Sequence, residues 1–592
     1  MDPGTALGVV SLAFQVFAGC IKGCQLLLDA RDLPQNYGYM RHRLHLEQLK
    51  LLDWWNASDF AAETISEDDP LDERTQALLD SLVEIRTLTL EFGRIKGRYD
   101  LMLKIVDGRQ RSSTPSITGL LTPEFLGTRE ILRQKALRYA DIVLKCPTML
   151  RWAMFDATKF EQLLAKLTEL NNSMHFSLEF KQRCRYLQFQ ETTQLQFLHL
   201  FTKLDQVVEL LRSLRLPPQN SLDGSQADSD DGVLKTLGQL ARFKALYISV
   251  DDDNLPSEEN ITARIGLQIS SPGSLKLSLS HLKFREDQEE QKAQRVAGTY
   301  DNALVWVEWK DYGEWNTTLA YSYVEDRVAR LAALFLDNPD KPRGLRLPTA
   351  HGYVHDPVST RFGLVFELPA IGSISVPQSL YTRLQTTMKP SLTTRLDMAR
   401  KLTASLEHLH ATKWLHKGLR SDNILFLTSS SSSDWMLFCL AGFDYSRPAN
   451  PGALTELPSD RREHDLYRHP NVQFDVPREG EYGYREEHDV YSLGVVLMEI
   501  GLWQPIHQFL GISLNRLIPR PKVREVRKQL LKVGSLATLE AETGCRYSEA
   551  VRICLEGNPW ANFTALQEDR EPVRTSRSRI NRAQEILQSI QM

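Results

Sequence analysis

The residues of this chain with the most direct chemical meaning lie in the segment His416-Lys417-Gly418-Leu419-Arg420-Ser421-Asp422-Asn423. An asparagine such as Asn423 can hold a magnesium ion through its amide oxygen, and acid–base chemistry beside it needs a side chain that accepts a proton. Position 418 is a glycine, which has no side chain and can neither accept a proton nor orient a hydroxyl group. The segment therefore lacks a general base at position 418.

Three other segments accompany this loop in a fixed order. Val307-Glu308-Trp309-Lys310 ends a β-branched and aromatic run before it, and Gly442-Phe443-Asp444 and the segment from Glu487 to Val495 follow it. Together they resemble the motifs of a protein kinase, namely the strand lysine, the H-R-D-L-x-x-x-N catalytic loop, the D-F-G triplet and the start of a large helix. The resemblance covers about residues 277–557.

The resemblance implies a nucleotide site that is incomplete. Lys310 would contact the phosphates, Asn423 would hold metal, and Asp444 could reach the metal only with a shifted backbone. No G-x-G-x-x-G precedes Lys310, and only Glu325, near the start of the following helix, could pair with that lysine. We expect at most ATP binding without efficient turnover.

Two glycines replace the aspartates on which a kinase depends. Gly418 stands at the catalytic base and Gly442 at the magnesium ligand, so the resemblance implies no catalytic residue and no competent metal site. His416, Phe443 and Asp489 would keep structural roles, with Asp489 hydrogen bonding to the backbone of the catalytic loop. We therefore expect a pseudokinase rather than an enzyme.

The composition of the chain is that of an ordinary folded protein with several domains. It has 592 residues, 42% of them hydrophobic and 25% charged, and a net charge of -4. No long basic run appears, so we expect no nucleic-acid partner. Seven cysteines without a CxxC pair argue against a disulfide framework or a zinc site. We expect a cytoplasmic protein.

Leucine-rich patterns at helical spacing predict an all-α bundle over residues 1–215. Its first segment has no charged residue from Pro3 to Ile21, and it is preceded by Asp2 rather than by the basic residues of a signal peptide. This segment is slightly short for a membrane span, so we expect a helix that is buried in the bundle at rest. Because it carries no charge, it could enter a membrane once released.

The chain changes character after the bundle. Residues 216–235 are acidic and turn-forming and predict a flexible linker, and residues 236–276 predict a helical connector. Residues 277–380 are rich in strand patterns and residues 381–592 in helical ones. We therefore predict a multidomain protein, an all-α bundle followed by a two-lobed α+β fold like that of a protein kinase, with an N-lobe and a C-lobe at these boundaries.

The bundle also resembles a known family. The segments Leu7 to Leu28, Arg41 to Leu44 and Arg151 to Leu167 are similar to the fungal HeLo domain of the prion-inhibition and propagation family. The carboxyl-terminal motifs resemble the degenerate kinase module found behind such bundles in filamentous fungi. This resemblance implies a role in heterokaryon incompatibility and programmed cell death, in which the first helix enters a membrane.

These observations lead to a non-catalytic signalling protein as the expected function. The pseudokinase lobe would bind protein partners and regulate the bundle, which would be recruited to the plasma membrane and form homo-oligomers on activation. Two alternatives stay open: a weakly active Ser/Thr kinase that binds ATP, and a soluble scaffold. The residues expected to insert into the membrane are Leu7, Val9, Val10, Leu12, Phe14 and Phe17.

Overall fold

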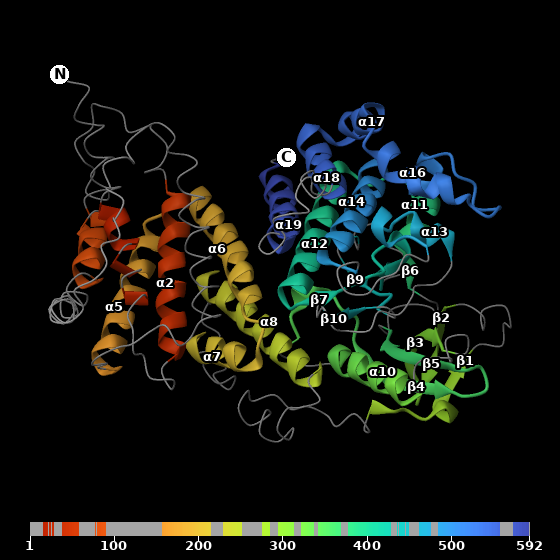
Figure 1. The fold of residues 1–592 in the computed structure, drawn as a ribbon, viewed down its shortest axis with the longest axis horizontal. Coiled ribbons are helices and arrows are strands. Elements are labelled where there is room, and N and C mark those ends of the chain that lie inside the picture. Colours follow the sequence, from red (N-terminus) through yellow and green to blue (C-terminus); the bar gives the residue numbers. More distant parts are fainter. Residues whose placement is uncertain are drawn as a thin grey trace, which may run out of the picture. The chain divides into compact units, whose positions relative to one another are not determined.

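The chain forms two compact units, Met1–Ala245 and Leu246–Met592 (Figure 1). A computed structural model describes residues 16–21, 23–24, 27–28, 38–58, 77–78, 80–89, 157–214, 229–251, 275–284, 294–312, 321–336, 341–368, 377–427, 435, 437–443, 446–448, 461–474, 483–556 and 572–590. An all-helical unit thus precedes a unit with an antiparallel sheet and helices, which confirms the multidomain prediction in this coarse form.

The first unit is built around one buried helix, α2 (Gly38–Ala57). Buried residues occur on every side of α2, because other helices pack around it (Figure 1). Two of its buried carboxylates are paired with other helices: Glu47 accepts a hydrogen bond of 2.8 Å from Asn171, and Asp53 accepts one of 3.0 Å from Thr193. The helices in contact with α2 are α5 (Ala157–Phe176), α6 (Phe180–Leu200) and α7 (Leu204–Leu214).

The helix α8 (Ser229–Asp251) changes the predicted boundary of this unit. Residues 229–235, predicted as linker, form the start of α8, and residues 215–228 lie outside the described residues. The compact unit continues to Ala245, where the buried Lys244 Nζ donates a hydrogen bond of 2.8 Å to the carbonyl oxygen of Leu198 in α6. Helical spacing of Leu237, Leu240 and Ala241 buries one face of α8, so residues 236–245 of the predicted connector belong to the bundle.

The second unit begins with a five-stranded antiparallel sheet in the order β1-β2-β3-β5-β4 (Figure 1). The central strand β3 alternates its side chains between two faces. One face carries Val305, Val307 and Trp309, which belong to a hydrophobic core. Glu308 therefore lies on the other face. The strands are β1 (Leu282–Phe284), β2 (Arg295–Tyr300), β3 (Ala303–Asp311), β4 (Ala350–Asp356) and β5 (Arg361–Glu367), and α10 (Tyr321–Phe335) contacts β4 and β5.

The rest of the second unit is mostly helical. The long helix α14 (Glu486–Leu502) is buried along nearly its whole length and contacts α12 (Leu392–Ala411), α17 (Val533–Thr543), α18 (Cys545–Glu556) and α19 (Pro572–Ser589). Short strands support the loops between these helices: β7 (Trp414–Leu415) pairs with β10 (Arg447–Pro448), and β8 (Ile424–Phe426) lies between β6 (Gln378–Ser379) and β9 (Phe438–Leu440). The loop from His416 to Asn423 therefore lies between β7 and β8.

Candidate functional site

The loop that follows β7 is held in place by a single carboxylate. Asp489, fully buried near the start of α14, accepts hydrogen bonds from the backbone N–H groups of His416 at 2.8 Å and Lys417 at 2.9 Å. Tyr484 donates a third hydrogen bond at 2.8 Å, and the His410 ring nitrogen Nε2 lies 3.2 Å away. These contacts fix the backbone of the loop, including Lys417, whose φ is +62°.

Asp489 is ionised despite its position in the interior. Burial acts to raise the pKa of this carboxyl, but the hydrogen bonds from His410 and Tyr484 and the electrostatic interaction with His410 hold the pKa below its ordinary value. An ionised carboxylate accepts stronger hydrogen bonds than a neutral acid. The group therefore acts as a fixed acceptor for the loop.

Aromatic rings connect this loop to the sheet. His416 lies 4.5 Å from Phe443, Phe443 lies 5.1 Å from Phe335 at the end of α10, and Phe335 lies 5.5 Å from Phe366 in β5, all as ring-centroid distances. Trp306 of β3 stacks on Phe366 at 4.4 Å. Burial lowers the pKa of His416 to about 4, so its ring is neutral and packs as an apolar surface at physiological pH. This series of ring contacts links the position of the loop to the sheet and to α10.

The two glycines of interest lie on either side of Asn423. The Asn423 Nδ2 donates a hydrogen bond of 2.6 Å to the carbonyl oxygen of Gly418. A Cβ atom added at Gly442 would lie 2.6 Å from Asn423 Oδ1 and closer still to its Nδ2 and Cγ, and Gly442 has a φ of +78°. The Asn423 carboxamide thus fills the space that a side chain at position 442 would require.

A buried ion pair occupies the centre of this site. Arg295 in β2 and Glu308 in β3 form it, with Nη2 of the guanidinium 2.8 Å from Oε1, and both side chains are mostly shielded from solvent. The same guanidinium donates to Asn423 Oδ1 at 2.5 Å and, through Nη1, to the Asp422 carbonyl oxygen at 2.8 Å. Glu308 Oε2 accepts a hydrogen bond of 3.2 Å from the Gly442 N–H. Arg295 and Glu308 therefore bind the sheet directly to the loop.

The remaining predicted nucleotide residues do not gather at this centre in the same way. Lys310 lies two residues after Glu308 and therefore on the same face of β3. It is half-buried and lies opposite Phe362 in β5. Glu325 forms an ion pair of 2.6 Å with Lys276 and accepts a hydrogen bond from Tyr353. Asp444 lies outside the described residues.

A magnesium nucleotide does not fit the residues at this centre. The oxygen of Asn423 that would ligate a metal accepts a hydrogen bond from a cation, and the position of the expected second ligand is Gly442. Within the part of the chain that the structure describes, no group of three or more His, Cys, Asp or Glu side chains could hold a metal ion. The positive charge beside Glu308 is the Arg295 guanidinium rather than a metal ion.

Sequence reasoning missed Arg295 and Glu308, although one of them carried a signal. Glu308 is a charged residue inside the apolar run Ala303 to Trp309, and a buried charge in a strand requires a partner. Nothing in the sequence near Arg295 identifies it as that partner.

A second buried carboxyl lies beneath the loop. Glu499 in α14 accepts hydrogen bonds from Tyr467 Oη at 2.7 Å and from the Ile506 N–H at 2.8 Å. The Tyr467 hydroxyl also lies 2.9 Å from Ser421 Oγ in the loop. Burial raises the pKa of Glu499 to about 8, so this carboxyl is largely protonated at neutral pH.

The raised pKa predicts a pH-dependent stability. Between about pH 4.3, the usual value for an unfolded Glu, and about pH 8, the folded chain binds a proton that the unfolded chain does not. Stability from this group is therefore complete at low pH and is lost as the pH rises through 8. Over this window the wild type should lose up to about 1.4 kcal/mol per pH unit more than Glu499→Gln, which cannot titrate.

Urea unfolding of the full chain from pH 5 to pH 8 measures this difference. A Glu540→Gln variant, at an exposed position of α17, is the matched control and should follow the wild type. Parallel pH profiles for the wild type and Glu499→Gln would contradict the assignment.

The first unit contains the one predicted membrane-acting residue that the structure describes. Phe17 is buried and stacks on Trp55 of α2, with ring centroids 4.3 Å apart and ring planes 13° apart. The neighbouring Cys20 Sγ donates to the Leu82 carbonyl oxygen at 3.1 Å, and Gln48 of α2 donates to the Ile21 carbonyl oxygen. The other predicted residues lie outside the described residues: Leu7, Val9, Val10, Leu12 and Phe14.

None of the helices among the described residues has the length and apolar character needed to cross a membrane. Residues 16–21 are instead part of the core of the helical unit, since the buried side chains there include Val16, Phe17, Cys20 and Ile21.

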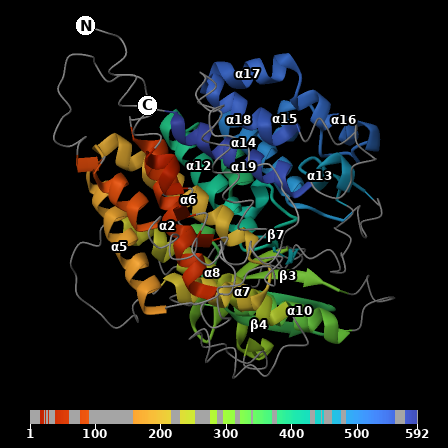
Figure 2. The ribbon, with the colours of Figure 1, turned by 60° about the vertical axis from the view of Figure 1, so that its left-hand side comes forward.

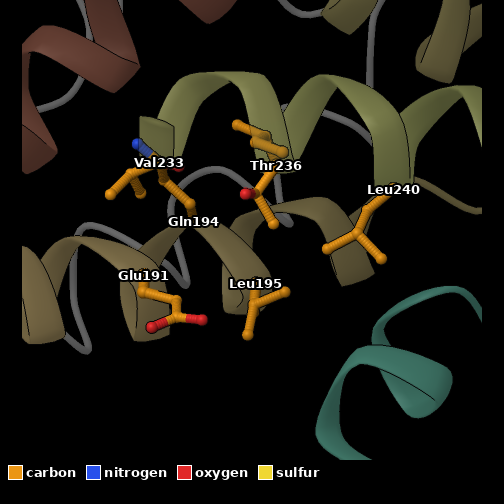
Figure 3. A pocket seen from close by; sticks show the side chains of 7 residues that line it. Glu191, Gln194, Leu195, Val233, Thr236 and Leu240 are labelled. Atoms are coloured by element: carbon orange, nitrogen blue, oxygen red, sulfur yellow. The ribbon is translucent and has the colours of Figure 1, made fainter. Parts of the chain in front are cut away.

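A pocket lies between α6 and α8 in the same unit. Figure 3 shows Leu195 and Gln194 of α6 facing Thr236, Leu240 and Val233 of α8. Its lining has a single charged residue, Glu191, and no arrangement of nucleophile and base. The pocket belongs to the packing of α8 on the bundle and has no catalytic constellation.

Comparison with known proteins gives a family match that lies within the first unit. Residues 4–210 match the family model of the HeLo domain, described as prion-inhibition and propagation. No curated protein matches the chain. The family match agrees with the helical fold of the described residues between 16 and 210.

Proposed function

We propose that this protein is a non-catalytic signalling protein in which a kinase-like unit regulates a HeLo-type helical bundle that acts on membranes. The match over residues 4–210 supports a role of the fungal incompatibility or cell-death type for the bundle. The order of the kinase-like motifs, with a sheet followed by helices, supports a regulatory lobe behind it. Protein partners would act through the second unit.

The main support for a non-catalytic role comes from the hydrogen bonds of the Asn423 side chain. Its Oδ1 accepts a hydrogen bond from Arg295, and its Nδ2 donates one to Gly418. Phosphoryl transfer depends on metal ions that neutralise the transferred charge and on a base that accepts the substrate proton. Position 418 offers no base, and Asn423 is committed to protein groups, so the centre serves to join the sheet to the loop.

The burial of Phe17 gives a physical reason why the bundle would need to be regulated. A helix whose end is stacked on Trp55 and bonded to α2 cannot enter a bilayer until these contacts break. Uncovering one buried phenylalanine side chain costs about 1.5–3 kcal/mol, and the neighbouring buried residues add to this cost. Activation would therefore lower the cost of opening the bundle, with homo-oligomers forming from the opened state.

A thermal-shift titration with ATP, with and without magnesium, tests the non-catalytic part. We expect no shift of the unfolding midpoint at millimolar ATP and no ATP turnover. A magnesium-dependent shift, together with turnover that disappears in a Lys310→Met variant, would instead support the weakly active kinase.

A vesicle-leakage assay tests the membrane part. The helical fragment should extend through Asp251, because a fragment ending at residue 215 would lack α8 and expose the face of α6 beneath it. We expect residues 1–251 to release vesicle contents faster than the full chain does, and Val10→Asp to abolish the release. Val83→Asp, at a position that is 47% exposed, is the matched control and should leave leakage intact.

The outcomes of this assay separate the hypotheses. Equal leakage from the fragment and the full chain would contradict restraint by the second unit. Leakage that persists in Val10→Asp would contradict the role of the first helix, and its absence from every sample would favour the scaffold.

A further inference from the structure

The segment from Leu514 to Val533 is far more basic than the rest of the chain. It contains seven basic residues and one acidic residue, Glu525, which gives a net charge of +6 in a chain whose total is -4. The segment comprises an exposed turn and the helix α16 (Arg520–Leu530), at the outer edge of the second unit (Figures 1 and 2). The basic residues are separated by others, so no continuous run appears in the sequence.

The helix α16 divides these residues between two faces. Val523, Val526 and Leu530 are buried and attach the helix to the unit. On the opposite face, the exposed residues Arg520, Arg524 and Lys528 recur at four-residue intervals and therefore lie in one row. Lys522 and Lys532 are exposed beside this row.

Arg527 shows the contrast between the two faces. Its guanidinium is half-buried and donates a hydrogen bond of 3.0 Å to the Leu555 carbonyl oxygen. Lys522, Lys528 and Lys532 have no ion-pair partner among the residues that the structure describes. Arg520 and Arg524 lie over the ring of Phe474, at 5.1 Å and 5.8 Å. Like charges four residues apart destabilise a helix, so an anionic surface lying against this row would relieve the repulsion.

Exposed apolar side chains stand at both ends of the basic row. Leu517, just before α16, is 73% exposed, and Val533, just after it, is 85% exposed; Leu514 is 37% exposed. An acidic peptide or a nucleic acid would leave these side chains in water. An anionic bilayer would bind the basic row through its headgroups and receive the apolar side chains at the boundary with the acyl chains.

We propose that the exposed basic face of α16, together with Leu514, Leu517 and Val533, is a docking surface for anionic membranes. It lies in the second unit and is separate from the amino-terminal helix. This surface holds the protein at a membrane through charge, and it requires neither insertion of the first helix nor a nucleotide. Because charge attraction dominates, binding weakens as the ionic strength rises.

Co-sedimentation of the full chain with vesicles tests this proposal. Vesicles of phosphatidylcholine with phosphatidylserine should bind the protein, and vesicles of phosphatidylcholine alone should bind it weakly. The triple variant Arg524→Gln/Lys528→Gln/Lys532→Gln should bind the anionic vesicles about tenfold or more weakly, since each lost charge removes a large part of the attraction. Leu517→Ser should weaken binding in both low and high salt.

A charge-matched control removes three exposed basic residues elsewhere, in Lys181→Gln/Lys283→Gln/Arg343→Gln, and should bind as the wild type does. Equal binding by the two triple variants would overturn the proposal. So would loss of vesicle binding in Val10→Asp alone, which would assign the membrane contact to the first helix. A triple variant at α16 that keeps vesicle binding but loses binding to polyglutamate would also overturn it, in favour of an acidic protein partner.

Discussion

Replacing Asp489 by alanine is expected to lower the free energy of unfolding of the second unit by about 3–5 kcal/mol, the cost of breaking a buried charged network. The substitution removes the acceptor for the backbone N–H groups of His416 and Lys417 and leaves both donors unsatisfied in the interior. It also removes the carboxylate that accepts the hydrogen bond of the buried Tyr484 hydroxyl. Urea unfolding of the full chain, followed by a signal from the second unit, measures the loss.

Two further substitutions make this result specific. Asp489→Asn keeps one acceptor oxygen and should cost less than alanine does. Asp397→Ala removes a carboxylate that forms a partly exposed ion pair of 3.3 Å with Arg400, and it should cost no more than about 1 kcal/mol. If Asp489→Ala and Asp397→Ala destabilise the protein equally, the buried carboxylate does not hold the loop.

Restoring a side chain at position 442 should damage the fold rather than rebuild an enzyme. Gly442→Ala places its Cβ against the Asn423 carboxamide and forces a non-glycine residue to adopt a φ of +78°. Backbone strain and steric overlap each cost about 1–3 kcal/mol, so we expect a loss of about 2–6 kcal/mol in the free energy of unfolding. Gly442→Asp should cost at least as much.

Gly418→Ala is the matched control for this prediction. Its Cβ would lie 3.0 Å from the Gly442 carbonyl oxygen and 3.4 Å from Asn423 Nδ2, a tight contact that small shifts can relieve. We expect a loss of about 1 kcal/mol or less. The double variant Gly418→Asp/Gly442→Asp should show no ATP turnover, because a side chain at position 442 overlaps the Asn423 carboxamide instead of completing a metal site. Measurable turnover in that variant would show that the two aspartates alone had been missing.

Local patterns in the amino-acid sequence predicted the helical and strand-rich segments of this protein and the order of its motifs. The leucine patterns before residue 215 predicted helices, and the described residues there are helical, because periodic burial needs only local spacing. The β-branched and aromatic composition of the segment from Ala303 to Trp309 predicted a strand, and β3 occupies it. The absence of side chains at Gly418 and Gly442 can be read from the sequence without any structure.

The groups that occupy the centre between those glycines are brought together by long-range contacts of the folded chain. Arg295 and Asn423 are 128 residues apart, and no local pattern relates a guanidinium in one strand to an amide in a distant loop. The strand pattern did not reveal that Glu308, rather than Lys310, lies against the loop, because that depends on how the sheet sits on the helices. The basic face of α16 likewise forms only when helical geometry brings residues four apart into one row. Partners of buried charges and the faces of helices are long-range properties, and the folded chain alone determines them.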